Sequence, residues 1–189
     1  MASKTGLQGL GQGAIAGAGI VAGFLPIAIG FGALTLKSGI SLGSTMGFSL
    51  WLFAGASQFA LLEALMQGLS TGAALATVVV INLRHLPMSL AAQRRYGHLP
   101  RWQRWILCQG LVDETFALES SLKQPRSFGF FLGLHLACWG AWNIGTLLGY
   151  QFGAFLPERW LRFALPGLFF CLLLGNLEER LGGSGGSGG

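Results

Sequence analysis

Ionisable side chains inside apolar segments are the first candidates for chemistry in this sequence. Placing such a group in a membrane-spanning helix costs about 2.5–3.5 kcal/mol on insertion scales. A chain that keeps several of them needs them for pairing or for function. The functional interpretation is a substrate or proton path, and the alternative is a structural ion pair. The ionisable residues that interrupt apolar runs are Glu63, Arg84, His85, Asp113, Glu114 and His135.

Arg84 is the expected partner of Asp113 or Glu114 inside a helical bundle. An arginine side chain stays charged, so it suits the role of a carboxylate anchor. Asn82 and His85 are three positions apart and share one helix face. A histidine there could carry a proton near neutral pH, although a hydrogen-bonded core histidine explains the residue equally well.

Proline and glycine in the first apolar run predict a broken helix. Pro26, Gly30 and Gly32 could interrupt it, and residues 165–167 could do the same near the C-terminus. The free N–H groups of a half-helix favour a carboxylate, and free carbonyl groups suit an ammonium group. The pattern therefore predicts a zwitterion site near the membrane midplane, with a simple proline kink as the alternative.

The elements that must position these residues are apolar helices. Hydrophobic residues make up 52% of the 189 positions and charged residues only 10%, against about 25% in soluble domains. We therefore expect an all-α, polytopic transmembrane helix bundle with about six spans and discontinuous helices. The apolar runs are 11–36, 44–67, 71–92, 105–122, 128–155 and 160–177.

A weak internal similarity links two of these runs. Residues 55–58 read Gly-Ala-Ser-Gln and residues 140–143 read Gly-Ala-Trp-Asn, each followed by a glycine at the same spacing, Gly68 and Gly153. Three-helix units in tandem have opposite orientations, so the pattern suggests a 3+3 inverted repeat. Chance similarity between glycine-rich helices is the alternative.

The basic residues predict orientation. The net charge of +5 is better explained by positive loops than by nucleic-acid binding, because four arginines gather in residues 94–104. This loop should face the cytoplasm. With six full spans, the N-terminus lies on the other side, as do Lys123 and Arg126, which weaken the assignment; a re-entrant segment would change it.

We expect the chain to divide into a transmembrane transporter domain, residues 1–181, and an engineered Gly/Ser linker, residues 182–189. Three cysteines lie in apolar runs and are expected to be buried thiols. No Walker A, Rossmann or zincin motif is present, so we expect no metal and no cofactor.

Ser57 suggests a second function class. Intramembrane serine proteases use a similar Gly-Ala-Ser-Gly element, and His85 or His135 could act as the base. The motif here is short and incomplete, because Gln58 replaces its last glycine. Small residues at a helix interface explain it better, so we expect that the protein is not an enzyme.

Four short motifs follow one another along the chain. They are Gly-Phe-Leu-Pro-Ile-Ala-Ile-Gly-Phe-Gly at 23–32, Phe-Ala-Gly-Ala-Ser-Gln-Phe at 53–59, Asn-Leu-Arg-His at 82–85 and Asp-Glu-Thr-Phe-Ala at 113–117. In this order they resemble the AzlC-type large subunit of bacterial branched-chain amino acid exporters. Residues 163–166, Phe-Ala-Leu-Pro, extend the resemblance more weakly.

The resemblance implies export of leucine, isoleucine and valine, with methionine as a further candidate. It also implies a small AzlD-type membrane partner, a multi-pass location in the bacterial inner membrane, and secondary transport driven by an ion gradient. A structural or assembly subunit, with the pathway in its partner, is the remaining alternative.

Physics and resemblance together predict the site residues. An apolar pocket near Phe53, Phe59 and Leu62 would take a branched side chain. Proton or ion coupling is expected at Asp113, Glu114 and Glu63. The expected substrate-binding residues are Pro26, Gly30, Gly32, Ser57, Gln58, Asn82, Arg84 and His85.

Overall fold

The computed structural model describes residues 2–157, and this part of the chain is helical with no β-strand. The predicted helical membrane bundle is confirmed. The sixth apolar run, 160–177, and the Gly/Ser segment, 182–189, lie outside the described residues. The helices are α1 (Ala2–Ala16), α2 (Ala18–Lys37), α3 (Leu42–Gly47), η1 (Phe48–Leu52), α4 (Gly55–Met66), α5 (Thr71–Asn82), α6 (His85–Arg95), α7 (Arg101–Gln109), α8 (Asp113–Ser121), α9 (Phe128–Phe152) and η2 (Gly153–Phe155).

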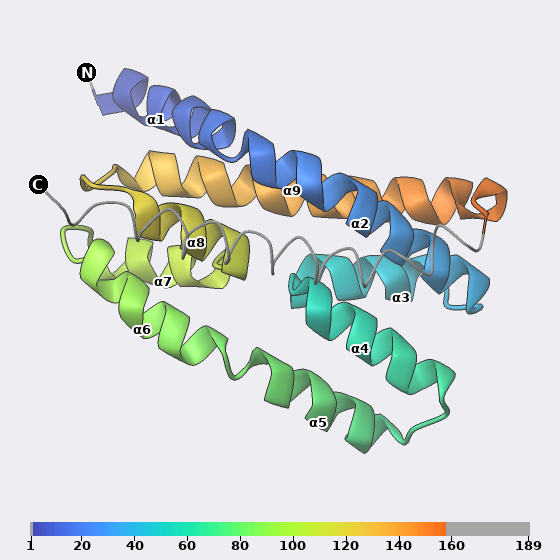
Figure 1. Cartoon of the computed structure of the whole chain (residues 1–189). Helices are drawn as coiled ribbons and strands as arrows, with labels where there is room; N and C mark the ends of the chain where they lie inside the picture. The colour runs from blue at the N-terminus through green and yellow to red at the C-terminus, as the bar shows by residue number, and fades with distance from the viewer. Residues whose placement is uncertain (1, 158–189) are drawn as a thin grey trace, which may run out of the picture.

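Helices α1 and α2 run parallel to α9 and pack closely against it (Figure 1). Glycines on both sides make this approach possible. A Cβ atom at Gly13 would overlap the carbonyl oxygen of Phe130, and one at Gly149 would overlap that of Ile29. Small residues let membrane helices gain van der Waals contact between backbones, so this seam forms the rigid part of the bundle.

The expected helix break at Pro26 is wrong. Helix α2 continues through Pro26 from Ala18 to Lys37. Membrane helices tolerate an internal proline where neighbours and local adjustments satisfy the freed backbone groups. Gly32 lies in the seam instead, since a Cβ atom there would overlap the carbonyl oxygen of Thr146.

The second apolar run does not cross the bundle but forms a re-entrant hairpin, residues 42–66, which we call the first hairpin. Helix α3 and the π-helix η1 lead inward, the chain turns at Phe53 and Ala54, and α4 leads back (Figure 1). Both ends lie beside the C-terminus of α2, because the Ser38 hydroxyl group lies 3.3 Å from the sulfur atom of Met66.

Helices α5 and α6 together form a long segment, Thr71–Arg95, that is apolar enough to cross a membrane. The two helices are separated by a short interruption at Leu83 and Arg84. This discontinuity places Arg84 at the start of α6, in the middle of the molecule rather than at its end.

The fourth apolar run also turns back and forms the second hairpin, residues 101–121. Helix α7 leads inward, the chain turns between Gly110 and Val112, and α8 returns (Figure 1). The loops at its two ends touch. Arg95 donates hydrogen bonds to the carbonyl groups of Leu122 and Ser120, at 2.8 and 3.1 Å.

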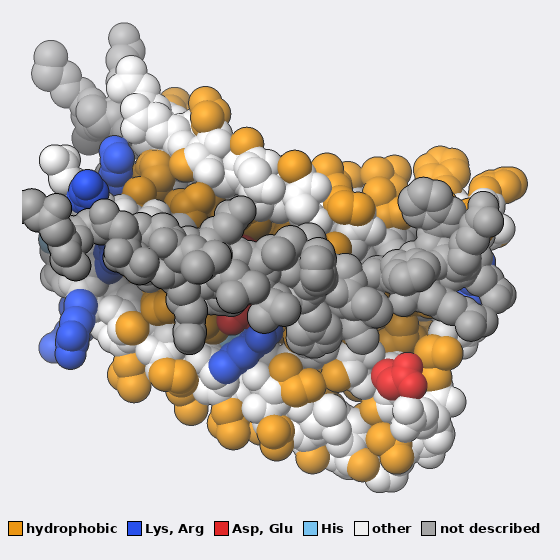
Figure 2. Space-filling view, viewed as in Figure 1, with side chains coloured by type: hydrophobic (Ala, Val, Ile, Leu, Met, Phe, Trp, Pro, Cys, Tyr) orange, Lys and Arg blue, Asp and Glu red, His pale blue; other side chains and the backbone are white. Residues whose placement is uncertain are grey.

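These hairpins correct the predicted orientation. Gly9 of α1 lies against Ser127, and the His98 ring lies 2.8 Å from the carbonyl oxygen of Arg126. The N-terminal helix, the arginine-rich loop and Lys123 therefore lie at one end of the molecule. Figure 2 shows Lys and Arg side chains gathered toward that end. The positive-inside rule now predicts that this end, N-terminus included, faces the cytoplasm.

A crossing segment followed by a hairpin occurs twice, in opposite directions. The first unit is α2 with the first hairpin, and the second is α5–α6 with the second hairpin. The sequence similarity that suggested a repeat does not mark it. Residues 55–58 begin α4 at a hairpin tip, whereas residues 140–143 lie inside the continuous helix α9.

Candidate functional site

The tips of the two hairpins meet in the middle of the bundle and enclose a small cavity, which we call the central pocket. Helices α2, α6 and α9 complete its walls. Two helix N-termini, those of α4 and α8, open onto it. The lining residues are Phe24, Phe53, Ala54, Gly55, Ala56, Arg84, Val112, Asp113, Glu114 and Trp142.

The N-terminus of α4 supplies free hydrogen-bond donors to the central pocket. The first helical hydrogen bond runs from the N–H of Gln58 to the carbonyl of Ala54, and no side chain caps this helix. The N–H groups of Gly55, Ala56 and Ser57 are therefore left without an intrahelical acceptor. Together with the helix dipole, they favour a bound anion.

Arg84 faces Asp113 across the pocket in the ion pair expected from the sequence, with 2.8 Å between nitrogen and oxygen. The two side chains are 36% and 30% exposed, so the pair is accessible rather than sealed. The Nε atom of Arg84 is buried and has no acceptor among the described residues. An unsatisfied guanidinium donor beside a cavity is typical of a group that binds a ligand.

Helix α8 supplies the negative charge at this site. Asp113 and Glu114 occupy its first turn, where the positive end of the helix dipole stabilises carboxylates. Thr115 closes the turn, because its hydroxyl group accepts a hydrogen bond from the N–H of Val112 at 2.9 Å.

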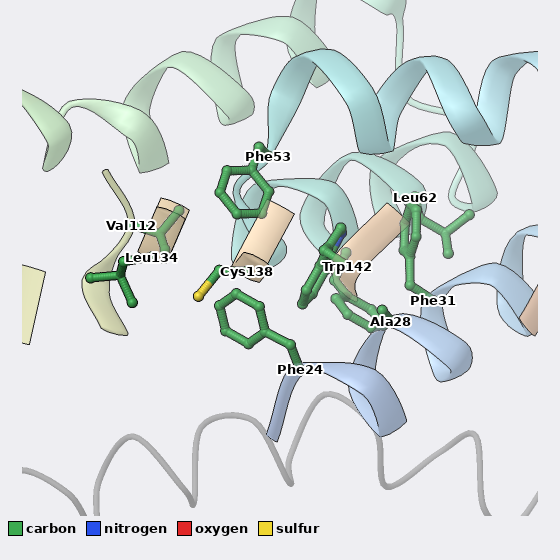
Figure 3. Packing of buried hydrophobic residues seen from close by; sticks show 10 residues of the cluster. Phe24, Ala28, Phe31, Phe53, Leu62, Val112, Leu134, Cys138 and Trp142 are labelled. Carbon is green, nitrogen blue, oxygen red and sulfur yellow. The ribbon is translucent and has the colours of Figure 1, made fainter. Parts of the chain in front are cut away.

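Three aromatic side chains form the apolar wall. Phe24 packs edge-on against both Phe53 and Trp142, with ring centroids 6.5 and 5.3 Å apart (Figure 3). Phe53 stands at the tip of the first hairpin with a φ of +20°, a conformation that costs a side-chain-bearing residue energy. The wall suits an aliphatic side chain.

The central pocket is closed in this conformation. Its volume is about 20 Å³, enough for roughly one water molecule. A molecule larger than water therefore enters only when the hairpin tips and the aromatic wall move apart.

Polar side chains behind the central pocket link the first hairpin to α5 and α9. The Ser57 hydroxyl donates to the side-chain oxygen of Asn82 at 2.7 Å, which ties the first hairpin to α5. The His85 ring lies 3.2 Å from the backbone carbonyl of Asn82. Gln58 accepts from the indole of Trp142 at 2.9 Å and donates to the carbonyl of Phe48 at 3.1 Å. These residues support the site rather than line it.

The remaining predicted residues lie elsewhere. Pro26 is exposed on α2, while Gly30 and Gly32 are buried, and Gly32 packs directly against α9. Glu63 is exposed and bonds to Gln67 at 2.7 Å near the outer end of the first hairpin. Phe24 and Trp142 line the pocket but were missed, because their sequence context does not differ from that of other core aromatics.

The hydrolase alternative finds no geometric support. The hydroxyl group of Ser57 is bonded to Asn82, and neither His85 nor His135 hydrogen-bonds to it. A serine nucleophile needs a base within hydrogen-bond reach, so this arrangement fits packing rather than nucleophilic catalysis.

Comparison with known proteins decides the family. A family profile described as AzlC protein matches residues 19–156, which is most of the chain. The chain belongs to the AzlC family. A membrane protein of Archaeoglobus fulgidus is 37% identical over 170 residues, with 85% of this chain and 73% of the relative covered. No solved structure matches the chain.

Two further relatives carry more specific names. The inner membrane protein YgaZ of Escherichia coli is 29% identical over 172 residues, which cover 85% of this chain and 70% of YgaZ. The branched-chain amino acid transport protein AzlC of Bacillus subtilis is 26% identical over 164 residues, which cover 82% and 63%.

A second polar cluster of this AzlC-family chain lies between the central pocket and the basic end of the molecule, and the sequence analysis did not predict it. Glu119 of α8 is 1% exposed, and its carboxylate lies 2.7 Å from the ring of His135 in α9. The hydroxyl of Tyr96 donates to its other oxygen. A signal existed, because Glu119 is a third acidic residue in the apolar run 105–122.

Proposed function

We propose that this protein exports branched-chain amino acids by secondary transport and that the central pocket is its substrate site. One observation carries the proposal. A helix N-terminus and Arg84 face two carboxylates, Asp113 and Glu114, next to an aromatic wall. This is the charge pattern of a zwitterion with an apolar side chain.

The substrate carboxylate binds at the N-terminus of α4 and accepts a hydrogen bond from the free Nε–H of Arg84. The ammonium group lies toward Asp113 and Glu114 on α8. Arg84 and Asp113 then trade part of their mutual ion pair for the two charges of the substrate. The exchange conserves charge, which keeps the cost of burying a zwitterion low.

The aliphatic side chain lies against Phe24, Phe53 and Trp142. The pocket opens when the hairpin tips separate, and alternate opening toward the two ends of the molecule moves the substrate across. Re-entrant hairpins that meet at mid-membrane suit such a cycle, because non-helical backbone at that depth is confined to cavities.

The relatives support this reading. The Bacillus subtilis relative is named for branched-chain amino acid transport, and the Escherichia coli relative is named as an inner membrane protein. Export, ion coupling, a small AzlD-type partner and a bacterial inner-membrane location complete the proposal. They follow from the resemblance of residues 23–32, 53–59, 82–85 and 113–117 to the family.

The test is leucine transport by the full chain in proteoliposomes, with and without the small partner. We expect efflux of labelled leucine that Asp113→Asn and Arg84→Gln abolish. Arg101→Gln, which removes an exposed arginine at the start of α7, is the matched control and should transport normally.

Each result has a clear meaning. Efflux without the partner assigns the pathway to this chain, and efflux only with it makes the pair the transporter. Normal efflux from both Asp113→Asn and Arg84→Gln would reject the central pocket. A complete absence of leucine transport with the partner present would leave a structural subunit as the better description.

A further inference from the structure

We propose that Glu119, His135 and Tyr96 form the proton-binding site that couples transport to a proton gradient, separate from the central pocket. This inference rests on the transport function proposed above and deepens it. It assigns coupling to a cluster on the C-terminal half of α8 and on α9, rather than to the carboxylates that contact substrate.

The geometry isolates an ionisable pair from solvent. Glu119 and His135 have side chains that are 1% and 5% exposed, and their atoms are 2.7 Å apart. Tyr96 is fully buried and bonds to the second oxygen of Glu119, so both carboxylate oxygens have partners. Buried ionisable groups inside membrane proteins are costly and typical of proton relays.

The Glu119–His135 pair lies between an apolar cluster and a solvent-accessible cavity. Tyr96 and a cluster that includes Leu107, Leu111 and Phe131 enclose the pair on one side. On the other side, Glu119 lines a wide cavity of about 970 Å³, whose lining also includes the exposed residues Arg94, His98 and Lys123. A proton can thus reach the carboxylate from the basic end of the molecule.

The charged and titratable groups around Glu119 come from every neighbouring helix. Helix α6 and its end contribute Arg95 and Tyr96, α7 contributes Cys108, and α9 contributes His135. Arg95 binds the carbonyl groups of Leu122 and Ser120 and not the carboxylate itself. His135 is therefore the proton-accepting partner of Glu119 among the described residues.

The proton balance is simple. With a proton bound to both ring nitrogens of His135, the pair is an imidazolium and a carboxylate with no net charge. Release of one proton to water in the cavity leaves a neutral imidazole and a net charge of −1. A buried, uncompensated charge is unfavourable, so the deprotonated state favours a conformation in which Glu119 meets water or a cation.

Helix α8 connects this cluster to the central pocket. Asp113 and Glu119 lie six positions apart on it, about 9 Å along the axis at ~1.5 Å per residue. The ring of His135 packs against Gly110 at the hairpin turn, where a Cβ atom would clash with it. A movement of α8 that follows deprotonation therefore also moves Asp113.

The experiment separates exchange from coupled transport. Leucine–leucine exchange at equal pH needs only the substrate site, whereas net transport under a pH gradient also needs the proton site. With one coupled proton, a gradient of one pH unit supports about a tenfold leucine concentration ratio. We expect Glu119→Gln and His135→Gln to keep exchange and to lose this ratio, which falls to about one.

A second measurement detects the proton directly. Leucine added to the weakly buffered wild-type protein should change the proton signal of a pH-indicator dye, and Glu119→Gln should abolish that signal. Arg101→Gln is the control, because Arg101 is exposed at the start of α7 and lies outside both clusters. It should keep exchange, the tenfold ratio and the proton signal.

The outcomes are decisive. Gradient-driven accumulation by Glu119→Gln would overturn the assignment, and so would a wild-type protein driven by a cation other than the proton. Loss of exchange or of folding in all of Glu119→Gln, Glu119→Asp and His135→Gln would make the cluster a structural tie and also overturn it. A wild type without any exchange would instead reject the proposed transport function.

Discussion

Two acid–base pairs take their carboxylate from α8 but differ in solvent exposure and in the chemistry of their cation. Arg84 and Asp113, which we call the tip pair, lie beside the central pocket, with side chains that are 36% and 30% exposed and an arginine Nε atom that lacks an acceptor among the described residues. Glu119 and His135, which we call the deeper pair because their side chains are nearly inaccessible to solvent, lie toward the basic end of the molecule. The tip pair has a buried donor without a partner, whereas both carboxylate oxygens of the deeper pair have partners.

The chemistry of each cation sharpens the difference. An arginine keeps its charge, so the tip pair can change partners but cannot release a proton. A histidine ring can bind or release a proton, so the deeper pair can change its charge without changing partners. One pair is suited to a ligand and the other to a proton, and the same helix carries both.

The largest expected effect comes from breaking only one member of the deeper pair. His135→Leu leaves the carboxylate of Glu119 without its cation and should lower the free energy of unfolding by about 3–5 kcal/mol. The triple change Tyr96→Phe, Glu119→Leu and His135→Leu removes all polar groups together and should be near neutral or stabilising. Denaturant titration in detergent micelles measures both.

The triple variant also separates stability from coupling. It should fold and bind leucine but accumulate none against a gradient. A triple variant as unstable as His135→Leu would show that the cluster is needed for folding, which would remove the contrast between the two pairs.

The next effect tests whether the tip pair is merely structural. Arg84→Asp and Asp113→Arg should each lower leucine binding by about 10–100-fold, or about 1.4–2.7 kcal/mol. Their combination restores an ion pair but puts an anion where the substrate carboxylate binds, so binding should stay lost. Equilibrium binding of labelled leucine is the measurement, and rescue by the double variant would indicate a tie between helices.

These two pairs also show how far the sequence could lead. Charge cost alone predicted that Arg84 pairs with Asp113 or Glu114, and apolar runs predicted a helical bundle. The runs could not show that two of them turn back, because an apolar hairpin and an apolar span have the same composition. The turns occur at Phe53–Ala54 and at Gly110–Val112, where no proline interrupts the chain.

The failed expectation at Pro26 has a related cause. A proline marks a possible break, but packing decides whether the helix continues, and α2 is held along its length by the glycine seam with α9. Glu119 was overlooked, although the sequence shows it as a carboxylate in an apolar run. Its partners come from elsewhere in the chain, Tyr96 from the arginine-rich loop and His135 from another apolar run, and only the fold brings them together.

A smaller effect is expected at Tyr96, which donates a hydrogen bond to Glu119 of the deeper pair. Tyr96→Phe removes one hydrogen bond to Glu119 and nothing else of similar size, so the free energy of unfolding should fall by about 0.5–1.5 kcal/mol. Denaturant titration in detergent micelles measures the change, and an unchanged free energy of unfolding would show that this hydrogen bond contributes nothing to stability.

The smallest effect is expected at Ser57, which lies behind the tip pair. Ser57→Ala removes the hydrogen bond to Asn82 and leaves the helix N-terminus of α4 intact, because the donors there are backbone N–H groups. Leucine efflux should change by less than about threefold, within the ~1 kcal/mol of one neutral hydrogen bond. A complete loss of function would instead make the hydroxyl group itself essential and would return the serine-based alternative to consideration.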